Sequence, residues 1–106
     1  MDSPADPCGA ARLASARQAI RLGLLDEARA ALAAAERAGA RGAAYLNLLG
    51  VVHELRRDWR AAKRHYGRAI RADRGYEAAR QNMRRLYELD TFGRCAENIA
   101  LGVELR

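Results

Sequence analysis

The feature that most constrains the fold of this chain is a repeat with a period of 34 residues. Shifting the sequence by 34 places residues 25–32 over residues 59–66. Both stretches show a bulky residue, two polar or small residues, an alanine, and another bulky residue four positions later; upstream, Ala16 falls on Gly50. Small residues that recur in register mark places where two helices touch backbone to backbone. A period of this length is typical of stacked helix pairs.

Start and stop signals divide the repeat into five helices. Asp6-Pro7 is a typical helix start, Gly23 a typical stop, and Asp58 a typical N-cap. Further turns are expected at 39–42 and 73–75. We therefore expect helices from the Asp6-Pro7 start to about residue 22, from about 26 to the turn at 39–42, over 43–56, from Asp58 to about 72, and over about 76–90. The short connections make neighbouring helices antiparallel.

Length and composition agree with a small helical domain. At 106 residues the chain has room for one modest core. Half of its residues are hydrophobic but only 6% are aromatic, and alanine supplies much of the apolar fraction. Alanine favours helices, because it loses no side-chain entropy there. A β-sandwich would instead require β-branched and aromatic residues.

The sequence resembles a tetratricopeptide repeat (TPR) protein, of the small adaptor type found in bacteria. Residues 43–76 carry the signature spacings of the family, at Leu46, Leu49, Gly50, Asp58-Trp59, Ala62, Tyr66, Ala69 and Asp73. Residues 9–42 are a weaker copy in the same register, and residues 77–90 resemble a closing first helix, with Met83, Leu86 and Tyr87 expected to face inward. The resemblance implies an all-α solenoid of antiparallel helix hairpins, about two and a half units long, over residues 1–90.

Three departures from the family pattern concern the turns and the end of the chain. Arg57 and Arg74 stand where the family often has glycine and proline. A complete third repeat is missing, although about three units are usual for a stable stack. In the remaining tail, residues 91–106, apolar residues alternate from Ile99 to Leu105, which indicates a strand-like or extended conformation. We expect this tail to cover an open helix face or to dock on a partner.

No residue set predicts catalysis, so the chain is expected to be a binding protein rather than an enzyme. His53 is interpreted as a packed or half-buried residue and His65 as solvent-facing, with no cysteine or carboxylate cluster beside either. Cys8 and Cys95 fit no metal or redox spacing. The carboxylates are accounted for by helix capping. We expect no cofactor and no metal. The first residues are acidic and do not resemble a secretory signal, and no apolar run is long enough to span a membrane. Because the two cysteines make a disulfide framework improbable, the cytoplasm is the expected compartment.

By resemblance to the family, the first helix of each pair lines a concave groove. The groove residues would combine apolar anchors, amides and arginines, which suit a peptide or protein segment: Leu13, Arg17, Asn47, Leu48, Val51, Glu54, Gln81, Asn82 and Arg85. A simpler interpretation for Leu13, Leu48 and Val51 is packing between the helix pairs. The carboxylate clamp by which some members hold a partner's C-terminus is not reproduced, because Leu13 and Leu48 replace its polar positions.

A second candidate surface is basic. Residues 56–85 hold eleven basic and three acidic side chains, whereas residues 1–55 hold six of each. On the predicted fourth helix, basic residues form a stripe opposite Trp59, Ala62, Tyr66 and Ala69; its members are Arg60, Lys63, Arg64, Arg68 and Arg71. The ordinary interpretation is a solvated helix face. A cluster of cations also attracts an acidic protein or a nucleic-acid backbone.

The sequence thus predicts an adaptor that holds another protein, without a cofactor, in the groove of a helical stack. The alternative is a nucleic-acid-associated module that uses the basic surface over residues 56–85. Nucleic acid is the less favoured partner, because no aromatic residues interleave the stripe for stacking. Apolar surface left at the open ends of two and a half repeats also favours self-association.

Overall fold

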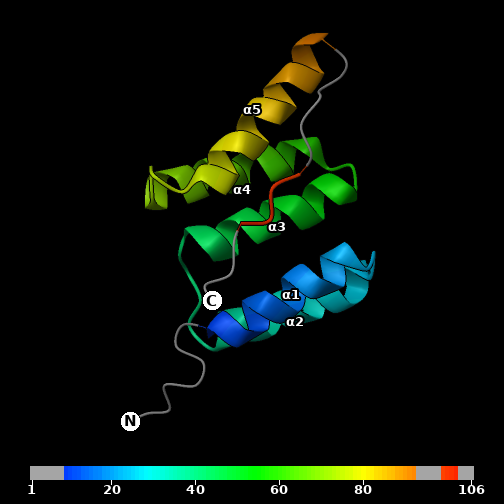
Figure 1. The fold of residues 1–106 in the computed structure, drawn as a ribbon, viewed down its shortest axis with the longest axis vertical. Coiled ribbons are helices and arrows are strands. Elements are labelled where there is room, and N and C mark those ends of the chain that lie inside the picture. The colour runs from blue at the N-terminus through cyan, green and yellow to red at the C-terminus, as the bar shows by residue number, and fades with distance from the viewer. Residues whose placement is uncertain (1–8, 93–98, 103–106) are drawn as a thin grey trace.

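The computed structural model describes residues 9–92 and 99–102, and this part of the chain is all-helical (Figure 1). The described helices are α1 (Ala10–Arg21), α2 (Leu25–Arg37), α3 (Ala43–Leu55), α4 (Trp59–Ala72) and α5 (Glu77–Phe92). The predicted all-α class with five helices is confirmed, and the helix ends that can be compared lie within about two residues of expectation. The Asp6-Pro7 start and the two cysteines lie outside the described residues.

The helices form two hairpins and a closing helix. Helix α1 packs against α2, and α3 packs against α4. Contacts of α3 with α1 and α2 join the hairpins, and α5 packs on α4 and α3. Figure 1 shows these parts following one another along the long axis, from the α1–α2 hairpin through α3 and α4 to α5. Among the described helices, α1 and α5 do not pack directly against each other.

The 34-residue period of the sequence is also a period of the backbone. Gly23 and Arg57, 34 residues apart, both adopt the left-handed conformation, with φ of 77° and 66°. The amide of the next residue then donates to the carbonyl five positions back, from Leu24 to Ala19 at 2.8 Å and from Asp58 to His53 at 2.9 Å. This pattern closes a helix with a left-handed residue. Arg57 thus takes the conformation that Gly23 adopts one period earlier.

The α3–α4 hairpin is the more closely packed at its centre. Gly50 of α3 faces the ring of Tyr66, which is fully buried, and a Cβ at residue 50 would lie 2.5 Å from Cε1 of that ring. Helix α4 begins at the predicted cap, where Oδ1 of Asp58 accepts a hydrogen bond from the amide of Ala61 at 3.2 Å. The small residue and the cap together fix the crossing of the two helices.

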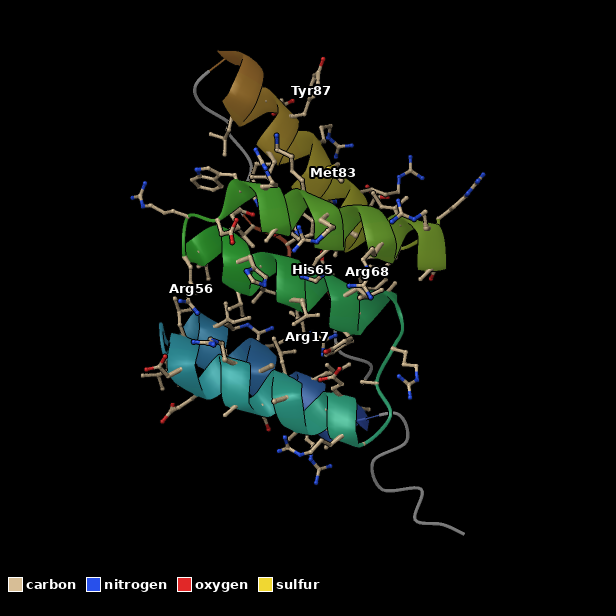
Figure 2. The ribbon with its side chains drawn as sticks, turned by 180° about the vertical axis from the view of Figure 1, so that it is seen from behind. Arg17, Arg56, His65, Arg68, Met83 and Tyr87 are labelled. Atoms are coloured by element: carbon tan, nitrogen blue, oxygen red, sulfur yellow. The ribbon has the colours of Figure 1, made fainter. Side chains whose placement is uncertain are left out.

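The pattern changes at α5. Continuing the period by 34 places Arg84 at the position of Gly50 and Thr91 at the position of the Arg57 turn, but α5 runs on through Phe92. The inward placement of Tyr87 was wrong, because its side chain is 68% exposed, whereas Leu86 is buried and Met83 half-buried. Tyr87 lies on the edge of α5 where a following antiparallel helix would pack, and no described helix covers that edge (Figure 2).

The core consists of two clusters of buried side chains. The larger joins α1, α2 and α3, with Leu32 and Leu48 among its most buried members. The smaller joins α3, α4 and α5 through Val51, Tyr66 and Leu86. None of the described helices combines the length and the apolar character that crossing a membrane requires.

Candidate functional site

Residues 99–102 lie across the helices whose side chains the sequence assigned to the groove. In Figure 1 this non-helical segment crosses α3 between α1 and α5. It is therefore the contact that links α1 and α5, which do not otherwise pack together. Of the two roles expected for the tail, covering a helix face of the same chain is confirmed for these four residues.

Two asparagines hold the main chain of Ala100. Oδ1 of Asn82 accepts from the Ala100 amide at 2.7 Å, and Nδ2 of Asn82 donates to the Ala100 carbonyl at 2.7 Å. Asn47 donates to the same carbonyl at 3.1 Å and accepts from Nδ2 of Asn82 at 2.9 Å. Both asparagine side chains are fully buried. A carboxamide that pairs with both main-chain polar groups of one residue recognises backbone rather than side chain.

A third helix adds a contact one residue further on. Arg17 of α1, which is 6% exposed, donates from Nε to the carbonyl of Leu101 at 3.1 Å. The segment is thus held by side chains from α1, α3 and α5. We name Arg17, Asn47 and Asn82 the main-chain clamp. All three members belong to the groove residues predicted from the sequence.

Apolar contacts and one glycine complete the packing of residues 99–102 on the helices. Leu101 packs against both core clusters, and Ile99 against the smaller one that contains Val51. Gly102 has a φ of 88°, and a Cβ there would overlap Oη of Tyr76. A cavity of about 510 Å³ lies beside the segment and is lined by Gly75, Tyr76, Glu77, Ala78, Gln81, Ala100, Leu101 and Gly102.

A buried ionic network supports the clamp from below. Arg85 of α5 forms a two-pronged ion pair with the carboxylate of Glu54, and its Nη2 also reaches Oδ1 of Asn82 at 3.4 Å. Tyr66 donates to Oε1 of Glu54 at 2.7 Å. Burial and the Glu54 carboxylate both raise the pKa of the Tyr66 phenol, which stays protonated. The network fixes α4, α3 and α5 relative to one another and orients Asn82.

The predicted groove residues separate into four groups. Arg17, Asn47 and Asn82 contact the tail, and Glu54 with Arg85 forms the ion pair beneath them. Leu13, Leu48 and Val51 are core residues, as the simpler interpretation had them. Gln81 is half-buried and lines the cavity beside the tail. The sequence did not predict the role of Tyr66 in the ionic network, nor the contact between Tyr76 and Gly102.

The basic stripe lies on the outer side of α4. Arg60, Arg64, Arg68 and Arg71 are exposed, and Lys63 is half-buried. Ala62, Tyr66 and Ala69 are buried opposite them as predicted, but Trp59 is 40% exposed because it is the first residue of the helix. Nη1 of Arg68 lies 3.2 Å from Nδ1 of His65 (Figure 2).

The two histidines stack on each other. Their ring centroids are 5.1 Å apart with the planes 18° from parallel, and Nδ1 of His53 lies 3.8 Å from Oδ2 of Asp58. Both are half-buried, so the solvent-facing placement of His65 was only partly right. Burial, His53 and the arginines of α4 lower the pKa of His65 to about 4. Within the described residues no group of three histidines, cysteines or carboxylates is placed to hold a metal.

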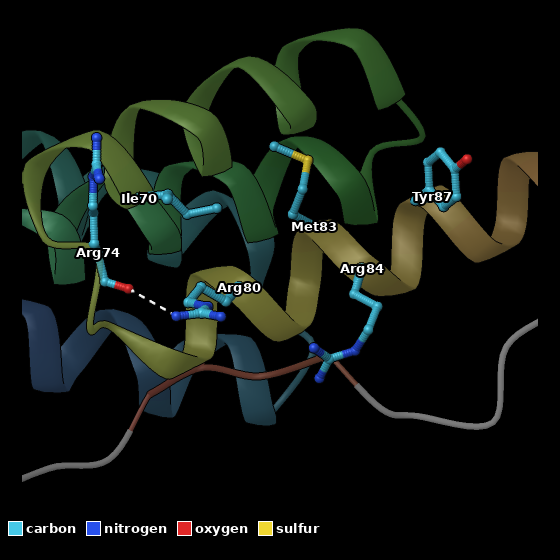
Figure 3. Close-up of a pocket in the computed structure, with 6 residues that line it drawn as sticks. All are labelled: Ile70, Arg74, Arg80, Met83, Arg84 and Tyr87. Carbon is cyan, nitrogen blue, oxygen red and sulfur yellow. Dashed lines mark hydrogen bonds between the residues drawn. The ribbon is translucent and has the colours of Figure 1, made fainter.

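A second concavity opens between α4 and α5. It has a volume of about 550 Å³, with Ile70 and Met83 on its floor and Arg74, Arg80, Arg84 and Tyr87 around it (Figure 3). Arg80 donates to the carbonyl of Arg74 at 3.3 Å. None of the described residues that line this concavity is a carboxylate, so the basic character of residues 56–85 extends onto α5.

Comparisons of the chain with protein-family models, with curated proteins and with solved structures return no match.

Proposed function

We propose that this chain is a TPR-type adaptor that binds a segment of another protein in the groove formed by α1, α3 and α5. One observation carries the proposal. The main-chain clamp holds a non-helical segment through its backbone polar groups. The segment happens to belong to the same chain, but the contacts address atoms that every peptide possesses.

Burial of the clamp gives this interaction its strength. A buried carboxamide without a partner costs free energy, so Asn47 and Asn82 favour any occupant that supplies both an amide and a carbonyl. Hydrogen bonds to main chain give affinity, while apolar contacts on either side give selectivity. Within the part of the chain that the structure describes, this geometry offers no nucleophile, base or metal set, which favours binding over catalysis.

The proposal is tested by locating where a peptide binds. Twelve-residue peptides displayed on phage would be selected on the full chain, and a selected peptide would be titrated into ¹⁵N-labelled protein. We expect the side-chain amide signals of Asn47 and Asn82 to shift together with the main-chain signals around Arg17. The triple variant R60E/R64E/R68E should bind the peptide with unchanged affinity. Shifts confined to the outer face of α4 would contradict the groove as the binding site.

The second candidate function is nucleic-acid binding by the surface over residues 56–85. It is favoured by the exposed arginines of α4 and by Tyr87, an exposed aromatic ring beside Arg80 and Arg84. Binding to phosphates should weaken steeply with salt, because it releases counterions. An oligonucleotide whose affinity falls at least tenfold between 50 and 200 mM salt, and is abolished by R60E/R64E/R68E, would establish this function.

A further inference from the structure

Residues 99–102 indicate which chemistry the groove selects. We propose that the groove binds segments of the form apolar–any–apolar–glycine, and that Ile99-Ala100-Leu101-Gly102 is an intramolecular copy of this ligand, which a partner segment displaces. The proposal rests on the function proposed above and adds to it the sequence class of the partner and the competition with the tail.

The glycine is the most selective position. Gly102 has a φ of 88°, a conformation that residues with a side chain adopt only with strain. Its Cα also approaches Tyr76 so closely that an added Cβ would overlap Oη. That oxygen is buried and has no hydrogen-bond partner among the described residues. Backbone conformation and steric contact therefore require the same residue at this place.

Two apolar positions flank a permissive one. Ile99 and Leu101 pack against the cluster of Val51, Tyr66 and Leu86, so polar residues there would lose these contacts. Ala100 is recognised through its amide and carbonyl, which every residue except proline provides. The cavity beside it, lined by Gln81 and Glu77, leaves space for a larger side chain at this position.

The mode of attachment makes the segment displaceable. Its four residues keep part of their surface exposed, whereas Asn47 and Asn82 beneath them are fully buried. On release the helices keep their own contacts with one another, and a partner segment of the same pattern would cover the apolar surface that Ile99 and Leu101 leave. An intramolecular ligand nevertheless competes strongly, because a short tether gives it an effective concentration on the order of millimolar. A partner segment must outcompete it.

The experiment uses the full chain and one defined probe. The probe is a fluorescein-labelled peptide with the sequence of residues 97–104, Glu-Asn-Ile-Ala-Leu-Gly-Val-Glu. Binding is measured by anisotropy to the wild-type chain and to Gly102→Val, whose tail is weakened by both strain and overlap. We expect the variant to bind the peptide at least tenfold more tightly. Adding Asn82→Ala to this variant should abolish the gain.

A peptide in which leucine and glycine exchange places is the matched control, because its composition and charge are identical. It should bind at least tenfold more weakly than the probe to Gly102→Val. Equal affinity of wild type and Gly102→Val for the probe, or equal affinity of the variant for both peptides, would overturn the proposal. If peptides selected from the library bind the groove but lack the apolar–any–apolar–glycine pattern, the proposed function stands and this inference fails.

Wild-type protein provides a second measurement that does not depend on a variant. The Ala100 amide should exchange with deuterium at least a hundredfold faster than the most protected amides of α3, and excess probe peptide should accelerate its exchange further. Exchange of the Ala100 amide only at the rate of global unfolding would show that the segment is a fixed part of the fold.

Discussion

Asn47 and Asn82, from α3 and α5, donate a hydrogen bond each to the carbonyl of Ala100 and are themselves joined by a bond of 2.9 Å. Each carboxamide thus forms one hydrogen bond with the other carboxamide and at least one with the tail. The helical stack and the tail segment are therefore coupled through two fully buried side chains. Stability and occupation of the groove should respond to the same substitutions.

Replacing Asn82 by alanine should destabilise the protein by about 2 kcal/mol, because it leaves the Ala100 amide and the buried oxygen of Asn47 without this partner. Urea denaturation followed by circular dichroism measures the change. Gln81→Ala, at the half-buried neighbouring position, is the control and should change stability by less than about 0.5 kcal/mol. Equal effects of the two substitutions would contradict a structural role for the asparagine pair.

Replacing Arg85 by methionine should cost about 3–5 kcal/mol, because it leaves the carboxylate of Glu54 buried without its cation. Arg84→Met removes the same charge from an exposed neighbour and should stay within about 0.5 kcal/mol of the wild type. The free energy of unfolding of both variants is compared at pH 7. A small loss in Arg85→Met would mean that Glu54 finds water or another partner.

Gly50 and Gly67 lie in consecutive helices and should respond in opposite directions to alanine. A methyl group at residue 50 would overlap the Tyr66 ring, so Gly50→Ala should cost about 1–3 kcal/mol. At residue 67 the nearest atom to an added Cβ is Cε of Met83 at 3.6 Å, an ordinary contact. Gly67→Ala should therefore stabilise α4 by up to about 1 kcal/mol. Thermal unfolding of the two variants distinguishes a close helix contact from general intolerance of side chains.

Arg57→Gly should stabilise the protein by about 1 kcal/mol, because arginine at a φ of 66° bears a strain that glycine lacks. Arg56→Gly, one residue earlier with a φ of −90°, gains no such relief and is expected to destabilise slightly. Urea midpoints of the two variants are compared with that of the wild type. A stabilisation by Arg56→Gly as large as that by Arg57→Gly would exclude backbone strain as the cause.

Acidification should weaken the fold through His65. Its pKa of about 4 in the folded protein lies below the ordinary value of 6.5, so the unfolded chain takes up the proton first as pH falls. Above about pH 6.5 His65 is neutral in both states and does not weaken the fold. As the pH falls towards 4, the free energy of unfolding should decrease through His65 by about 1 kcal/mol after solvent screening. The charged groups that act on this ring are Arg64, Arg68 and Asp58, together with the stacked His53.

The variant His65→Gln isolates this effect from other acidic groups. The difference in unfolding free energy between wild type and variant should change between pH 7 and pH 4.5, with the wild type losing more. Identical pH profiles of the two proteins would show that His65 binds its proton equally well in both states.

Much of the fold could be predicted from the sequence because its signals are local. Gly23 ends α1 with a positive φ, and Asp58 caps α4, as residues of these types do in most proteins. The recurrence of small residues identified the close approach at Gly50. The prediction for Tyr87 was wrong because it relied on helical spacing, which groups Tyr87 with Met83 and Leu86. Spacing shows that residues share a face of the helix, but it does not show how much of that face a neighbouring helix buries.

The site was predicted in part, for a reason that is equally physical. Arg17, Asn47 and Asn82 were placed in one groove through the TPR resemblance, and they do converge. The segment that they bind could not be predicted. The alternation from Ile99 to Leu105 indicates an extended backbone, but it does not indicate on which surface that backbone packs. The contact of Gly102 with Tyr76 and the ionic network of Glu54 depend on three-dimensional proximity, for which no local pattern exists.

The replacement of Gly50 by Arg84 one period later limits how this molecule can grow. In the α3–α4 hairpin the two helices cross at Gly50, where the Tyr66 ring leaves no space for a side chain. A helix that packed on α5 as α4 packs on α3 would meet the side chain of Arg84 at the corresponding crossing. A third hairpin with the geometry of the second therefore requires a small residue in place of Arg84.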